Sequence, residues 1–142
     1  MGTELLIDNS AWFRLYDPAL PVARADEIAD EFAAERIVTC GPFLLEAGYS
    51  ARSGGDHQEI MSELTALPFL AIDGGIEKRA LDAQAQLARI GHHRLPVVDL
   101  LLAAIADHHQ IGVLHYDGDF EVIRTKTDLD FRSEWLVPRG SL

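Results

Sequence analysis

Short apolar runs alternate with longer segments of helical periodicity along nearly the whole chain of 142 residues. The first run is Leu5-Leu6-Ile7, and the segments between the runs carry apolar residues three and four positions apart. Strands that alternate with helices form a mostly parallel sheet, because each helix carries the chain back to the start of the next strand. The pattern therefore predicts an α/β fold with helices on both faces of the sheet.

Turn residues and prolines set the boundaries of the predicted elements. Asp8-Asn9-Ser10 ends the first strand, and Gly91 ends the long helix that precedes Pro96. The expected strands cover residues 4–7, 36–39, 68–72 and 111–116, with an edge strand within 128–135. The expected helices cover residues 11–16, 23–35, 42–52, 56–67, 76–90 and 97–109, with a short helix after residue 119.

One domain of ordinary size accounts for most of the chain. Residues 136–141 read Leu-Val-Pro-Arg-Gly-Ser, the thrombin-cleavage sequence of expression vectors. We therefore interpret residues 136–142 as a vector remnant and residues 1–135 as the domain. The single cysteine, Cys40, excludes an internal disulfide. Because no apolar run is long enough to span a membrane and the N-terminus has no basic segment, we expect a cytoplasmic protein without membrane contacts.

The charge balance is strongly acidic, with 12 Lys and Arg against 23 Asp and Glu, a net charge of −11. A chain of this charge is poorly suited to non-specific binding of duplex nucleic acid, where Lys and Arg neutralise phosphates. The excess of acids has two interpretations. It can serve solubility alone, or some of the carboxylates can gather around a cation. Composition does not choose between them.

Two acids stand directly after predicted strands. Asp8 follows Leu5-Leu6-Ile7, where it can cap the next helix, and Asp117 follows the run that ends at Tyr116. Asp117-Gly118-Asp119 is also compatible with an ordinary turn. Neither acid is therefore diagnostic on its own.

Two further acids lie in apolar helical segments. Asp99 is the only charged residue between Val97 and Ala106, and Glu46 stands in a similar run that begins at Phe43. A carboxylate in such surroundings costs several kcal/mol (~2–7 for a buried polar group) unless it is hydrogen-bonded, paired or bound to a metal. The alternative to a functional role is a buried ion pair with an arginine.

The four acids are expected at one edge of the sheet, because the carboxyl ends of parallel strands point the same way. Carboxylates brought together in one pocket repel each other and raise one another's pKa values. A divalent cation removes this repulsion, and an all-oxygen set of ligands favours Mg²⁺ or Mn²⁺ over zinc. The sequence thus predicts a site for a divalent cation at this edge of the sheet.

The ordered set of motifs resembles the acidic motifs of PIN-domain ribonucleases, and in particular VapC-type toxins of bacterial toxin–antitoxin pairs. It consists of Leu6-Ile7-Asp8-Asn9-Ser10, Glu46 in an apolar helix, Val98-Asp99-Leu100 and Tyr116-Asp117-Gly118-Asp119. The resemblance implies a PIN-like three-layer αβα fold over residues 1–135. It also implies an Mg²⁺- or Mn²⁺-dependent endoribonuclease that hydrolyses RNA phosphodiester bonds and is neutralised by a VapB-type antitoxin. A homodimer and a toxin–antitoxin hetero-oligomer are the expected assemblies.

The resemblance also assigns roles to residues. The catalytic acids would be Asp8, Glu46, Asp99 and Asp117, and the metal ligands would be Asp8, Asp99, Asp117 and Asp119. Ser10 would contact a ligand carboxylate or the scissile phosphate.

Partner contacts are expected outside the acids. Arg14 and Arg52 are candidates for RNA contacts, and an apolar groove lined by Trp12, Phe13 and Leu44 is the expected seat of the antitoxin.

Two other functions remain open at this stage. The first is a catalytically silent PIN-like module that binds a protein or an ion through its acids. The second is a phosphatase of the haloacid dehalogenase type, which also has an Asp after its first strand. That class expects a second Asp two positions later, where this chain has Ser10.

Overall fold

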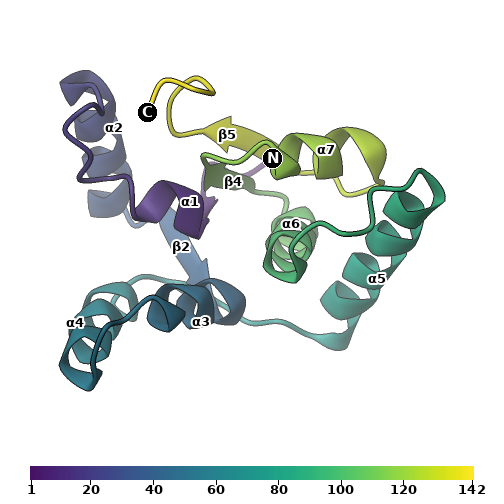
Figure 1. The fold of residues 1–142 in the computed structure, drawn as a ribbon, viewed down its shortest axis with the longest axis horizontal. Helices are drawn as coiled ribbons and strands as arrows, with labels where there is room; N and C mark the ends of the chain where they lie inside the picture. Colours follow the sequence, from purple (N-terminus) through teal and green to yellow (C-terminus); the bar gives the residue numbers. More distant parts are fainter.

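The computed structural model describes residues 1–142 and contains one five-stranded sheet of order β3-β2-β1-β4-β5 (Figure 1). The strands are β1 (Leu5–Ile7), β2 (Ile37–Cys40), β3 (Phe69–Leu70), β4 (Gly112–His115) and β5 (Arg132–Trp135). All neighbouring strands are parallel, and the predicted strand within residues 128–135 is confirmed as the edge strand β5.

Helices cover both faces of the sheet, which confirms the predicted three-layer α/β fold. They are α1 (Asn9–Trp12), α2 (Val22–Ala33), α3 (Gly41–Tyr49), α4 (Gly54–Leu64), α5 (Gly74–Arg89), α6 (Val97–His109) and α7 (Asp119–Lys126). In Figure 1, α2 and α4 lie on one side of the sheet and α5, α6 and α7 on the other. No helix combines the length and the apolar character that a membrane crossing requires.

The strand order reverses between β1 and β4, the two central strands. The chain leaves β1 toward β2 on one side of the sheet and leaves β4 toward β5 on the other. Ile7 at the end of β1 is in register with Leu114 near the end of β4. The segments that follow these strands therefore lie side by side at the carboxyl edge, where open α/β sheets place their functional groups.

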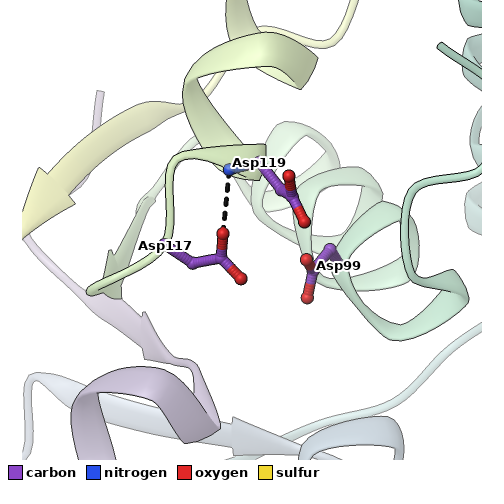
Figure 2. Close-up of side chains that lie close together, drawn as sticks. All are labelled: Asp99, Asp117 and Asp119. Carbon is purple, nitrogen blue, oxygen red and sulfur yellow. Dashed lines mark hydrogen bonds between the residues drawn. The ribbon is translucent and has the colours of Figure 1, made fainter.

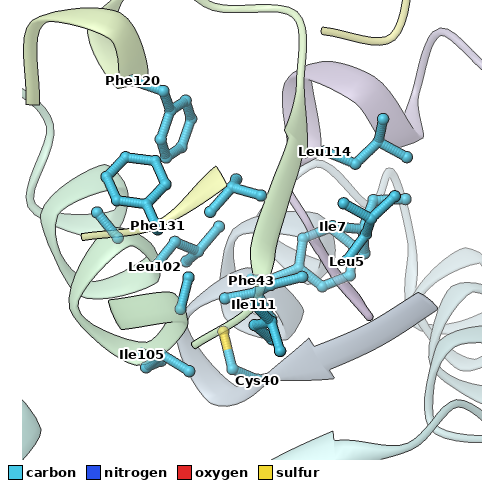
Figure 3. Close-up of a cluster of buried hydrophobic side chains, with 14 of the residues drawn as sticks. Leu5, Ile7, Cys40, Phe43, Leu102, Ile105, Ile111, Leu114, Phe120 and Phe131 are labelled. Atoms are coloured by element: carbon cyan, nitrogen blue, oxygen red, sulfur yellow. The ribbon is translucent and has the colours of Figure 1, made fainter. Parts of the chain in front are cut away.

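The hydrophobic core lies between the central strands and the helices that pack on them (Figure 3). All three residues of β1 are buried, as expected of a central strand covered on both faces. Leu102 and Ile105 of α6 are fully buried on one side of the sheet. The thiol of Cys40 is also buried, which raises its pKa to about 11, and it forms no disulfide.

Several helix boundaries differ from those predicted because side-chain caps fix them. The first helix begins at Asn9 instead of residue 11, since Asp8 caps it through the backbone N–H of Ser10. The helices α4 and α5 each start two residues early, where Ser53 and Asp73 accept bonds from N–H groups of the first turn. The strand predicted over residues 68–72 is reduced to Phe69–Leu70, and α5 begins soon after it.

The C-terminal segment 136–142 folds back onto the domain after β5. Leu136 and Val137 are buried, and the backbone N–H of Leu136 donates to the carbonyl oxygen of His115 at 2.7 Å. The interpretation of this segment as a vector remnant stays a prediction. In the structure, Leu136 and Val137 belong to the hydrophobic core, and residues 138–141 are exposed.

Candidate metal centre

Asp8 and Asp117 occupy equivalent places at the ends of the two central strands. Asp8 follows β1 directly, and its backbone N–H donates to the carbonyl oxygen of Leu114 in β4 at 2.9 Å. Asp117 lies two residues after β4 and accepts a bond on Oδ1 from the backbone N–H of Asp119 at 3.0 Å. The reversal of strand order thus brings both acids to one edge of the sheet, as the sequence predicts.

The third acid, Asp99, lies in the first turn of α6 and is 4% exposed. The helix is apolar nearly all round and packs against β4, α3, α5 and α7, so its N-terminal turn is carried to the same edge. Pro96 provides no side-chain cap at the start of the helix. One oxygen of the Asp99 carboxylate, Oδ2, is buried without any hydrogen-bond partner.

Three of the acids form a compact cluster. Asp99, Asp117 and Asp119 each offer one carboxylate oxygen, and these oxygens all lie within 4.8 Å of one another (Figure 2). Asp99 comes from the first turn of α6, Asp117 from the turn after β4 and Asp119 from the start of α7. Figure 2 shows the carboxylates directed toward a common space between the elements. The sequence predicts these three residues as metal ligands, and the structure brings them together.

Asp8 and Glu46 lie next to this cluster but are not members of it. Asp8 is 3% exposed and its Oδ1 has no hydrogen-bond partner. Glu46, on α3, is partly exposed and makes no hydrogen bond or ion pair. Both acids are close enough for their charges to raise the pKa of Asp99. The structure therefore brings all five predicted acids to one edge of the sheet. Three of them have carboxylate oxygens close enough to one another to bind a single ion.

The electrostatics of the site are those of buried and partly buried carboxylates that lie close together. Burial, followed by the charges of its acidic neighbours, raises the pKa of Asp99 to about 8. Burial is also the main cause that raises the pKa of Asp8, of Glu46 and of Asp119, and neighbouring carboxylates add to it. None of the ion pairs in the structure includes any of these acids, so the alternative of a buried arginine pair is wrong.

A divalent cation fits this site on two observations. The donors are all carboxylate oxygens, which suit a hard cation. Two buried oxygens, Oδ1 of Asp8 and Oδ2 of Asp99, lack any partner in the protein, and unpaired buried polar groups are costly. Asp99, Asp117 and Asp119 could hold the ion, with Asp8 beside them.

Ser10 connects the two strand ends that carry the acids. Its hydroxyl donates to Oδ2 of Asp8 and accepts a bond from the backbone N–H of Tyr116 at 2.9 Å. One of the two predicted contacts of Ser10, that with a ligand carboxylate, is therefore present. The same bond lowers the pKa of Asp8 against the effect of burial. The second aspartate that a haloacid-dehalogenase-type site needs is replaced in this chain by a hydroxyl.

His115 holds the turn that carries Asp117. Its Nδ1 accepts a bond from the backbone N–H of Asp117 at 3.1 Å, and its Nε2 lies 2.6 Å from Oγ of Ser133. Ser133 in turn donates to Glu121 at 2.6 Å. Burial lowers the pKa of His115 to about 4, so the ring is neutral and carries its proton on Nε2. The side chain of His115 is thus buried in the core and also holds the turn of Asp117 in position.

One residue that lies beside the acids is not among the site residues predicted from the sequence. Arg139 lies in the C-terminal segment, and its positive charge acts on the carboxyl of Asp119. The sequence places this residue within the thrombin-like segment, outside the predicted domain. Arg139 neither follows a predicted strand nor interrupts an apolar helix, so the sequence pattern does not indicate a functional position.

A family model described as the PIN domain matches residues 5–126. The chain is 36% identical to "Ribonuclease VapC51" of Mycobacterium tuberculosis over 143 aligned residues, which cover 100% of this chain and 99% of the relative. It is also 36% identical to "Ribonuclease VapC21" of the same species, over 99% of each chain.

Solved structures give the same fold. The chain is similar to one in the DNA-bound VapBC structure from Salmonella typhimurium, with a TM-score of 0.71 and 16% identity over 96% of this chain and 100% of that one. It is also similar to a chain of VapBC-5 from Mycobacterium tuberculosis, with a TM-score of 0.65 and 18% identity over 93% and 99% of the two chains.

The fold and the site first define a class of protein: a parallel α/β domain with a cluster of carboxylates that could bind a divalent cation, at the edge where the strand order reverses. With the family match and the relatives, the particular family follows, and the chain belongs to the PIN-domain family, among the VapC ribonucleases.

Proposed function

We propose that the protein is an Mg²⁺- or Mn²⁺-dependent endoribonuclease and the toxin of a toxin–antitoxin pair, acting in the cytoplasm. The observation that carries this proposal is the cluster of Asp99, Asp117 and Asp119, whose carboxylate oxygens lie within 4.8 Å of one another with no cationic side chain between them. Relatives at 36% identity are named ribonucleases, which supports RNA as the substrate.

The chemistry to be supplied is the hydrolysis of a phosphodiester bond. A divalent ion held by carboxylates lowers the pKa of a bound water and offsets negative charge on the phosphoryl oxygens. In the proposed mechanism, Asp99, Asp117 and Asp119 would hold the ion, and Asp8 would complete the set of ligands. The hydroxyl of Ser10 keeps the Asp8 carboxylate in position.

Glu46 is the proposed general base. Its carboxylate makes no bond within the protein, and it is partly exposed at the edge of the acidic cluster. Burial and the nearby carboxylates raise its pKa, which makes it a better proton acceptor than an ordinary surface glutamate. It accepts the proton of the attacking water on a carboxylate oxygen as the water oxygen bonds to phosphorus. The bond to the leaving oxygen breaks, and that oxygen takes up a proton from solvent water.

Two arginines remain candidates for RNA contacts. Arg14 lies between the rings of Phe13 and Tyr116, at 4.5 Å and 4.8 Å from their centroids. Arg52 lines a pocket of about 790 Å³ together with Asn9 and Phe13, next to the position of Asp8 in the chain. We propose that both arginines contact the RNA near the cleavage site.

A VapB-type antitoxin is the proposed partner, since similar solved structures are described as VapBC complexes. The apolar pocket closest to the expected groove is lined by Trp12, Leu15, Phe32, Leu64 and Leu67 and measures about 290 Å³. The three residues expected to line the groove differ in their positions. Trp12 belongs to it, whereas Phe13 faces the neighbouring pocket and Leu44 packs against the core.

We also propose the homodimer that the sequence analysis expects. Leu81 of α5 and Val97 of α6 are 65% and 64% exposed and line one pocket between these helices. Exposed apolar side chains grouped in this way are typical of protein interfaces.

The test is cleavage of single-stranded RNA by the purified protein. We expect cleavage with Mg²⁺ or Mn²⁺, none with EDTA, and none by Asp99→Asn under any condition. Asp26→Asn, at an exposed acid of α2, is the matched control and should cleave like the wild type. Cleavage by Asp99→Asn or in EDTA contradicts the proposal. Metal binding without any cleavage supports the alternative, a silent acidic binding module.

A further inference from the structure

The C-terminal segment 136–142 is anchored to the domain at both ends. At its start, the N–H of Leu136 donates to the carbonyl oxygen of His115 at 2.7 Å and continues the ladder between β4 and β5. The side chain of Arg24 donates to the carbonyl oxygen of Leu136 at 2.6 Å. At its end, the N–H of Leu142 donates to the hydroxyl of Tyr116 at 2.9 Å. The segment therefore lies over the loop that follows β4, beside the acidic cluster.

Within this segment, the guanidinium of Arg139 lies over Gly118. A Cβ built on Gly118 would be 3.1 Å, 3.1 Å and 3.2 Å from the Cζ, Nη1 and Nη2 atoms of Arg139. Because these three distances are nearly equal, the flat face of the guanidinium covers the glycine. Gly118 separates Asp117 from Asp119, and the absence of a side chain there allows the close approach. The cation is thus held against the turn that carries two of the proposed metal ligands.

Arg139 is not used for bonds within the protein. It is exposed, and its side chain takes part in none of the hydrogen bonds or ion pairs of the structure. In contrast, Arg24 and Arg36 pair with glutamates, and Arg14 donates to the carbonyl oxygen of Ser10. Arg139 therefore presents free N–H donors to solvent at the rim of the cluster.

A free cation at this place matters because the chain carries a net charge of −11. The negative charge of five carboxylates repels the phosphates of an approaching RNA strand, unless positive groups nearby offset this charge. The positive charge of Arg139 acts on the carboxyl of Asp119, one of these acids. A guanidinium binds a phosphate with two parallel N–H bonds, and a lysine does not.

We propose that Arg139 is a substrate-binding residue that contacts a backbone phosphate of the RNA beside the Asp117–Asp119 turn. This inference rests on the proposed function, because it assigns a contact for the same RNA substrate. It also assumes that residues 136–142 belong to the natural protein. The alignment with one relative covers 100% of the chain and so extends through this segment.

The experiment measures binding of a fluorescently labelled single-stranded RNA by anisotropy at several salt concentrations. All proteins carry Asp99→Asn, so that bound RNA is not cleaved. Arg139→Ala should weaken binding roughly 10- to 100-fold, the range for losing hydrogen bonds to a charged group. It should also reduce the slope of log affinity against log salt by about 0.7, because one phosphate contact is lost. Arg139→Lys should keep the slope but bind more weakly than the parent.

Arg89→Ala is the matched control, since Arg89 is exposed at the end of α5 and has no ion-pair partner. It should leave both the affinity and the salt slope unchanged. Thermal melting of each variant checks that the fold is intact. If Arg139→Ala matches its parent in affinity and slope while the wild type still cleaves RNA, this inference is overturned and the proposed function stands. If the parent binds no RNA and the wild type cleaves none, both are overturned.

Discussion

At the scale of single residues, the acids of the site are positioned by their neighbours in the chain and are not paired with any cationic side chain. Asp8 is fixed by Ser10, and Asp117 by the N–H of Asp119. Asp99 has no such bond on Oδ2. The fold therefore holds the carboxylates in place and leaves two of their buried oxygens without a hydrogen bond. These unpaired oxygens lower the free energy of unfolding of the protein without metal, and they are available to bind an ion.

Asp99 should make the stability of the metal-free protein depend on pH. The unfolded chain releases this proton at about pH 3.9, whereas the folded chain keeps it until about pH 8. Between these values the folded state binds more protons, so the free energy of unfolding falls as pH rises. We expect Asp99→Asn to remove this pH dependence. At pH 8, the free energy of unfolding of the variant should exceed that of the wild type by an amount of the order of a few kcal/mol.

Urea unfolding in EDTA at pH 5 and at pH 8 measures this difference. The advantage of Asp99→Asn should be larger at pH 8 than at pH 5. Asp26→Asn, on the exposed face of α2, should show no such change. An equal difference at both pH values would show that the Asp99 carboxyl is ionised in the fold throughout, which would contradict its raised pKa.

Ser10 should matter for activity through the position of Asp8. Ser10→Ala removes the hydroxyl that donates to Asp8 and accepts from the N–H of Tyr116. Loss of a group that orients a metal ligand typically costs about 10- to 100-fold in metal affinity or activity. We expect a decrease in cleavage rate of this size, partly restored by a higher Mn²⁺ concentration. Ser62→Ala, at an exposed serine of α4, is the control and should be unaffected.

At the scale of elements, the alternation of strands and helices is enough to predict the parallel sheet and the edge at which the acids meet. The apolar character of α6 makes Asp99 conspicuous in the sequence, and the structure places it in the cluster. The caps at Asp8, Ser53 and Asp73 shift helix starts by two residues, which periodicity alone does not resolve.

The position of the C-terminal segment in the fold could not be predicted from the sequence. The packing of Leu136 and the placement of Arg139 over Gly118 depend on long-range contacts with the loop after β4. Local patterns carry no information on such contacts, and the likeness of residues 136–141 to a protease site favours a different interpretation of the segment.

The strand β4 should be sensitive to any side chain at Gly112. A Cβ there would lie 2.8 Å from a side-chain carbon of Leu5 and 3.1 Å from the carbonyl oxygen of Arg132, on the two neighbouring strands. We expect Gly112→Ala to lower the free energy of unfolding by roughly 1–3 kcal/mol, the usual cost of overpacking. Gly41→Ala, where a Cβ meets nothing within 4 Å, should be neutral or slightly stabilising. Urea titration of both variants compares the two sites, and equal stabilities would contradict the packing described for β4.

At the scale of the whole molecule, one antitoxin segment could contact both the acidic cluster and the apolar pocket near α1. An antitoxin segment that places an Arg among Asp8, Glu46, Asp99 and Asp117 would replace the charge of the ion. We expect such a segment to be disordered alone, to require that Arg or a Lys, and to compete with Mn²⁺.

Titration of the protein with the C-terminal half of the cognate antitoxin, at zero and at saturating Mn²⁺, tests this competition. Affinity should fall when Mn²⁺ is present, and Trp12→Ala should weaken binding in both conditions because the apolar contact is lost. Equal affinity with and without Mn²⁺ would show that the antitoxin covers the site without entering it.

The central claim is that the acidic cluster is a metal centre, and calorimetric titration of Mn²⁺ at pH 7 tests it most directly. In buffers of different ionisation enthalpy, the wild type should bind the ion and release about one proton for each ion bound, because the pKa of Asp99 lies at about 8 before binding. Asp99→Asn should bind far more weakly and release almost none. Equal binding and equal proton release by the two proteins would contradict the claim.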